Sequence, residues 1–113
     1  MRGSTSQWFG PAVLRTTIVP ARLALRGALP NPFQKSTQIA FDLPFGAGET
    51  RVTIFDAAGR RVRALFSGAL APAEQRVFWD GRGDAGSDLA AGIYLVRLET
   101  RLGVRTGRVV KMP

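Results

Sequence analysis

Short stretches of alternating apolar and polar residues, separated by turns that contain glycine or proline, run from residue 21 to residue 112. The clearest alternation covers residues 37–43, where Thr37, Ile39, Phe41 and Leu43 would share one face of a strand. Strands are also predicted at residues 21–28, 51–56, 61–66, 75–80, 93–100 and 104–112. No stretch has the spacing of a convincing helix.

Most of these strands have an apolar face that would point into a core. The expected inward positions are Val52 and Ile54; Val62, Ala64 and Phe66; Val77 and Trp79; and Tyr94, Val96 and Leu98. Trp79 is expected to anchor the core, because a buried indole contributes a large apolar area. The number and length of the strands predict an all-β, seven-stranded immunoglobulin-like (fibronectin III-like) antiparallel β-sandwich.

The chain is predicted to consist of a tail, or a remnant of an upstream region, at residues 1–20 and one domain at residues 21–113. Pro11 and Pro20 interrupt regular structure in the tail, where a short strand at residues 13–19 is conceivable. No signal peptide is expected, because Gly10 and Pro11 break the first apolar stretch. No apolar run is long enough to predict an integral membrane segment.

Composition argues against an enzyme. The chain has no cysteine and no histidine, which removes cysteine nucleophiles, thiolate metal sites and the side chain that titrates near neutral pH. We therefore expect no catalysis and no cofactor. The net charge is +8, but only Arg60, Arg61 and Arg63 cluster, so no nucleic-acid partner is expected. These three arginines are predicted to lie at a loop and on a solvated strand face.

Turn residues explain several motifs. Pro30 and Pro32 would fix the path of the chain, and Gly59 would close a hairpin in the left-handed conformation. Gly92 would permit a close turn before the strand that carries Tyr94, whose hydroxyl would bond at a corner.

Three aspartates, Asp80, Asp84 and Asp88, are spaced four residues apart in a glycine-rich loop. Carboxylates on a flexible loop could bind calcium. The spacing is not that of an EF-hand, and aspartate next to glycine is the ordinary composition of a turn. We therefore favour a structural role for this loop and predict no metal site.

Four motifs together resemble the FlgD-type Ig-like domain, which occurs in the flagellar hook-capping protein and at the C-termini of many secreted bacterial proteins. They are residues 30–33 (PNPF) with 36–44 (STQIAFDLP), 52–63 (VTIFDAAGRRVR), 79–86 (WDGRGDAG) and 91–98 (AGIYLVRL). We interpret the motif residues as mainly structural: Pro30, Asn31, Pro32, Phe33, Gly59, Trp79, Asp80, Gly81, Gly86, Gly92 and Tyr94.

The chain is also similar to type IX secretion sorting domains, which share a Pro-Asn-Pro start, a Gly-x-Tyr and a basic residue in the final strand. Gly92, Tyr94 and Lys111 match the last two features. This resemblance implies a C-terminal sorting or anchoring domain of a secreted or cell-surface protein. Outer-membrane machinery would read it, and the upstream cargo would be missing from this chain.

Recognition by a partner is expected at the last strand, through Arg108 and Lys111, because an exposed edge strand can be read by strand addition. Deleting the last five residues is expected to abolish export and to leave the fold largely intact. Two other functions stay open. One is a structural assembly or adhesion module, as in a hook-cap scaffold. The other is a carbohydrate-binding accessory domain, for which Trp8 and Phe9 are the only adjacent aromatics outside the domain.

Overall fold

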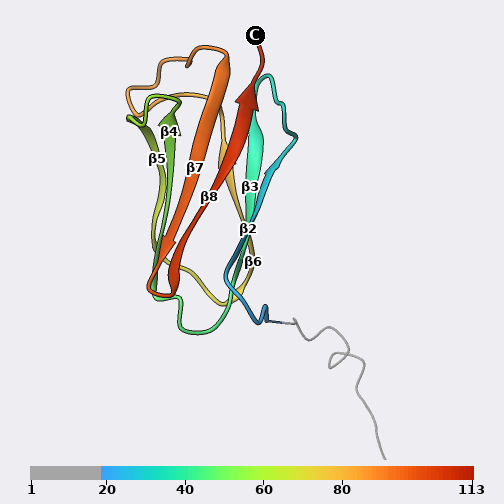
Figure 1. Cartoon of the computed structure of the whole chain (residues 1–113), viewed down its shortest axis with the longest axis vertical. Coiled ribbons are helices and arrows are strands. Elements are labelled where there is room, and N and C mark those ends of the chain that lie inside the picture. The colour runs from blue at the N-terminus through green and yellow to red at the C-terminus, as the bar shows by residue number, and fades with distance from the viewer. Residues whose placement is uncertain (1–18) are drawn as a thin grey trace, which may run out of the picture.

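Two antiparallel β-sheets packed face to face make up the computed structural model, which describes residues 19–113 (Figure 1). Residues 1–18 lie outside the described residues. They include most of the predicted tail, all but the last residue of the strand considered at 13–19, and Trp8 and Phe9.

Seven strands form these sheets. The first sheet has the order β2 (Ala24–Leu29), β3 (Thr37–Leu43) and β6 (Ala73–Trp79). The second has the order β5 (Arg61–Ala69), β4 (Glu49–Asp56), β7 (Gly92–Thr100) and β8 (Gly103–Lys111). All neighbouring strands within the two sheets are antiparallel. The prediction of a seven-stranded Ig-like sandwich is confirmed. Among the described residues there is no helix, and hence none that could span a membrane.

The core lies between the sheets and follows the predicted alternation. Thr37, Ile39, Phe41 and Leu43 are all buried on the inner face of β3. They meet the inward side chains of the second sheet, which include Val52, Ile54, Tyr94, Val96, Leu98 and Val109. Full burial of one such aliphatic side chain stabilises the fold by about 1.5–3 kcal/mol.

The predicted face of β5 is wrong. Val62 and Phe66 pack against the core as expected, but Ala64 is exposed and Leu65 packs inward instead. The reason is a pair of irregularities in the β4–β5 ladder, where Val62 and Leu65 have no partner residue on β4. Each extra residue shifts the alternation by one position, so a strict period of two cannot hold along this strand.

Core packing predicts a large difference between two isoleucines on strands. Ile39→Ala should lower the free energy of unfolding by about 2–5 kcal/mol, because it removes fully buried methyl groups and leaves a cavity. Ile93→Ala, at a side chain that is 46% exposed, should cost less than about 1 kcal/mol. Urea unfolding of both variants measures the difference. Equal losses would contradict the assigned core.

Candidate functional site: the motif end of the sandwich

The fold brings residues of all four motifs to one end of the sandwich. Strands β2, β4, β6 and β8 finish at this end, and β3, β5 and β7 begin there, which is the upper end in Figure 1. We call this region the motif end and define it as residues 30–33, 56–60, 79–94 and 108–112. The sequence alone could not show this proximity, because the first motif begins at residue 30 and the last at residue 91.

An aromatic cluster forms the centre of the motif end. The side chain of Trp79 is completely buried. Its ring lies 5.2 Å from that of Phe33 in a tilted arrangement, and 5.7 Å from that of Tyr94 in an edge-to-face arrangement. Trp79 Nε1–H donates a hydrogen bond of 3.0 Å to the carbonyl oxygen of Arg82. The indole therefore joins β6 of one sheet to β7 of the other and holds the following loop.

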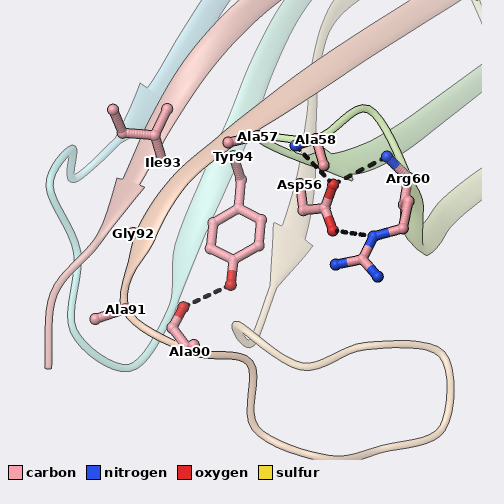
Figure 2. A pocket seen from close by; sticks show the side chains of 9 residues that line it. All are labelled: Asp56, Ala57, Ala58, Arg60, Ala90, Ala91, Gly92, Ile93 and Tyr94. Carbon is pink, nitrogen blue, oxygen red and sulfur yellow. Dashed lines mark hydrogen bonds and ion pairs between the residues drawn. The ribbon is translucent and has the colours of Figure 1, made fainter.

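Tyr94 makes the corner hydrogen bond that the sequence predicted for its hydroxyl. Its hydroxyl donates a hydrogen bond to the carbonyl oxygen of Ala90, four residues earlier, as Figure 2 shows. Burial raises the pKa of this phenol, and the charges of Asp56 and Asp88 raise it further. Tyr94 therefore stays protonated at neutral pH and remains a donor in this contact. Gly92 begins β7 two residues before it.

The β4–β5 hairpin is closed by Asp56. Its Oδ1 accepts hydrogen bonds from the backbone N–H of Ala58 at 3.0 Å and of Arg60 at 2.9 Å, and its Oδ2 accepts one from Arg60 Nε at 2.9 Å (Figure 2). The backbone bond from Arg60 is the main reason that the pKa of Asp56 is lowered. Gly59 has a φ of +88°, the left-handed conformation that this turn requires.

A shallow hollow of about 340 Å³ lies between this hairpin and the start of β7 (Figure 2). Its ionisable side chains are Asp56, Arg60 and Tyr94. Asp56 and Tyr94 already bond other parts of the chain, and their pKa shifts move both further from neutrality. The hydrogen bonds of Asp56 and Tyr94 hold the two turns that border this hollow.

The Pro-Asn-Pro segment is attached to the last strand. Asn31 Oδ1 accepts a hydrogen bond from the backbone N–H of Val110 at 2.9 Å, and Asn31 Nδ2 donates to the carbonyl oxygen of Arg108 at 3.2 Å. The N–H of Phe33 donates to the carbonyl oxygen of Val110, and its carbonyl accepts from Met112. These bonds cover the edge of β8 at the motif end.

The Pro-Asn-Pro segment is also attached to β3. The peptide bonds before Pro30 and Pro32 are both cis. The hydroxyl of Thr37, at the start of β3, donates a 2.7 Å hydrogen bond to the carbonyl oxygen of Pro30. Thr37 was predicted only as an inward strand position, and this second role had no visible pattern in the sequence.

Lys111 is not the exposed recognition residue that the sequence predicted. Its side chain is only 6% exposed, and Nζ lies 3.4 Å from Asp88 Oδ1. Its alkyl chain passes beside Gly81, where a Cβ would lie 2.8 Å from Lys111 Cε and 3.3 Å from the Phe33 ring. Gly81 also has a φ of +76°. The absence of a side chain at Gly81 therefore makes room for the buried lysine. Arg108, in contrast, is exposed as expected.

The three spaced aspartates have three different partners. Asp80 Oδ1 accepts from the N–H of Arg82 and from Arg63 Nη1. Asp84 Oδ1 accepts from the N–H of Ala64, and Asp88 pairs with Lys111. Between residues 19 and 113, no group of three or more acidic side chains has the arrangement of a metal site. The turn that follows Asp84 is closed by a hydrogen bond from Gly86 N–H to the Gly83 carbonyl.

Arg63 is not the solvated charge that the sequence predicted. Its guanidinium bonds Asp80 at 2.9 Å and the carbonyl oxygen of Arg82 at 2.8 Å, so it ties β5 to the loop after β6. The bonds of Asp84 to Val62 and Ala64 cover the adjacent edge of β5. No local pattern could have identified Arg63, because its partner lies 17 residues away in sequence. Arg60 and Arg61 are exposed, as predicted.

Comparison with known proteins identifies one family. A family model described as the FlgD Ig-like domain matches residues 28–103, which include all four motifs but neither Arg108 nor Lys111. No curated protein matches the chain. Among solved structures, the crystal structure of CopC from Methylosinus trichosporium OB3b is similar with 20% sequence identity and a TM-score of 0.40, covering 80% of this chain and 91% of that one.

The contacts of Asn31 predict that it stabilises the last strand. Asn31→Ala should lower the free energy of unfolding by about 1–2 kcal/mol, because it removes two hydrogen bonds to β8. Gln34→Ala is the matched control, since that exposed side chain makes a single long hydrogen bond, of 3.5 Å, to the carbonyl oxygen of Pro113. Urea unfolding compares the two variants. A loss no greater in Asn31→Ala than in the control would contradict the role of Asn31.

Asp80 predicts part of the pH dependence of stability. Partial burial opposes the charged carboxylate, but the bonds from Arg82 and Arg63 outweigh it and lower the pKa of Asp80. A lowered pKa means that its stabilisation is complete above the unfolded-state pKa of about 4 and is lost as the pH falls through the folded-state value. Asp80→Asn should therefore be less stable than the parent at pH 7, with a smaller difference at pH 2.

Unfolding by urea at pH 7, 5, 3 and 2 measures this effect. Glu49→Gln, at an exposed residue, serves as the control. A difference between Asp80→Asn and the parent that stays constant over the whole pH range would contradict the role of the ionised carboxylate.

Proposed function

The chain belongs to the FlgD Ig-like domain family, and on this premise we propose that it is the sorting or anchoring domain of a secreted or cell-surface bacterial protein. In this proposal the sandwich carries no catalytic site, and its parent protein reaches the surface through secretion machinery that contacts the motif end.

One observation carries the proposal. The three features that resemble a sorting domain form a single unit at the end of β8. Asn31 bonds Val110 and Arg108, Phe33 bonds Val110 and Met112, and Lys111 packs beside Phe33. Tyr94 joins this unit through Trp79. A rigid arrangement of this kind gives export machinery one folded surface to read, with little loss of conformational entropy on binding.

A binding role also agrees with the chemistry of the motif end. Asn31, Asp56, Asp80, Asp84 and Tyr94 all bond other parts of the chain. Catalytic groups need free contacts to a substrate and a pKa matched to their task. The family consists of non-enzymatic Ig-like modules, and these internal bonds support the same role for this chain.

A structural assembly module is the second candidate. It is favoured by large apolar side chains on the outer faces of the sheets, such as Phe78, which is 60% exposed, and Ile93. Exposed apolar side chains are frequent at protein–protein contacts. Carbohydrate binding is not favoured, because the exposed aromatic rings of residues 19–113, Phe45 and Phe78, lie on a loop and on β6 and form no common platform.

The structure changes how the last strand can be tested. Val109 is completely buried and Lys111 nearly so, and the backbone of Val110 and Met112 bonds the Pro-Asn-Pro segment. The expectation that the last five residues can be deleted without harm to the fold is therefore wrong. Arg108 is the better position for a test, because its side chain is exposed.

Export of a reporter tests the proposed function. The test protein is the full chain fused behind a fluorescent protein. In a bacterium that has a type IX secretion system, the fusion should raise the fraction of fluorescent protein found at the cell surface or in the medium at least tenfold. It should not do so in a mutant that lacks the system. Arg108→Glu should reduce export at least fivefold, whereas Arg76→Glu, at an exposed arginine on the other sheet, should not. Thermal unfolding confirms that both variants fold. Export no greater than that of the reporter alone would contradict the proposal.

A further inference from the structure

The outer face of the second sheet carries a row of side chains that take no part in the contacts of the motif end. The register of the four strands places Arg61 of β5, Phe55 of β4, Leu95 of β7 and Arg108 of β8 opposite one another. Opposite residues of antiparallel strands point to the same side of a sheet. Ile54, which precedes Phe55, is buried in the core, so this row lies on the side that faces away from it.

A second apolar pair extends this row. Ile93 lies opposite Val110 two positions closer to the motif end, and its side chain is 46% exposed. The guanidinium of Arg97 lies 4.5 Å from the centre of the Phe55 ring and covers it. We call this surface the basic–apolar face and define it as Phe55, Ile93, Leu95, Val110, Arg61 and Arg108.

Within the part of the chain that the structure describes, the two arginines of this face have no acidic partner. Among residues 19–113, Arg61 and Arg108 form no ion pair, and the two rows contain no acidic residue. The nearest acidic position on the outer side, Glu99, lies two rows further along and pairs with Arg51 and Arg97. Two uncompensated arginines at the ends of an apolar row are therefore complementary to carboxylates at the ends of an apolar segment.

The spacing of the strands defines the shape of such a segment. Adjacent strands lie about 4.8 Å apart, so the backbones of Arg61 and Arg108 are about 14 Å apart across the sheet. An extended chain covers about 3.4 Å per residue, so two side chains four residues apart span nearly this distance. We propose that the basic–apolar face binds an extended acidic segment of another protein, with two carboxylates four residues apart and apolar side chains between them.

Other occupants fit less well. Residues 1–18 contain no aspartate or glutamate, so the N-terminal part of this chain cannot supply the carboxylates. Single-stranded nucleic acid binds by stacking its bases on exposed rings, but Arg97 covers the ring of Phe55. Two arginines are also few compared with the basic clusters that bind anionic lipid surfaces. This inference goes beyond the proposed export role and does not depend on it.

A defined peptide tests this inference with the purified full chain. The probe is a capped ten-residue peptide of alternating valine and threonine that begins with valine and has glutamate at positions 3 and 7. The valine at position 5 then points to the same side as the two carboxylates. The control peptide has glutamine at positions 3 and 7. Binding is measured by titrating the ¹⁵N-labelled protein in 50 mM salt. The glutamate peptide should bind with a Kd below about 1 mM. The amide signals of the protein that shift on binding should centre on Phe55, Ile93, Leu95 and Val110.

Variants separate specific binding from general attraction to a basic protein. Arg61→Gln and Arg108→Gln should each raise the Kd about two- to fivefold, and the double variant about tenfold or more. Arg76→Gln, on the outer side of the other sheet, should leave it unchanged. Ile93→Ala should raise the Kd although it hardly affects stability.

Four results would overturn the inference. They are equal binding of the glutamine peptide, equal weakening by Arg76→Gln and Arg61→Gln, shifts that centre on other residues, and tighter binding of a twenty-nucleotide single-stranded DNA or of phosphatidylglycerol vesicles to the same face. Each readout uses the purified protein without secretion machinery, so failure here and failure of the export test are distinguishable.

Discussion

The motif end depends on the burial of one side chain, the indole of Trp79. It projects from β6 of the first sheet, meets Tyr94 of the second sheet edge-to-face, and packs against Phe33 of the Pro-Asn-Pro segment. Its ring nitrogen holds the carbonyl of Arg82 and thereby the loop whose Asp80 and Asp84 bond β5. Each motif is therefore tied to the others through the environment of a single ring.

This arrangement separates the residues that define the family from the surfaces that are free to bind partners. Asn31, Thr37, Asp56 and Tyr94 each bond the backbone through their side chains, and Lys111 is buried beside Gly81. They specify the path of the chain. The exposed side chain of Arg108, which lies outside the matched residues 28–103, carries no such structural duty.

Alternation predicted the architecture well where strands are regular. Every inward residue expected on β3 is buried, and all strand bounds agree within three residues. Sequence reasoning failed where contacts between distant segments decide the outcome. Bulges on β5 expose Ala64 and let Arg63 reach Asp80. Lys111 shares the inner face of β8 with Val109, which its spacing already indicated, but the room that Gly81 leaves for it is a tertiary feature.

Amide hydrogen exchange tests most directly whether the motif end is one unit with the core. The N–H of Val110 is held by Asn31, and the Nε1–H of Trp79 by Arg82. If the cluster opens only when the whole domain unfolds, both protons should exchange with the same free energy as the amide of Ile54 in the centre of the second sheet. Exchange through an opening several kcal/mol less costly than global unfolding would show that the motif end frays independently, and would contradict this account.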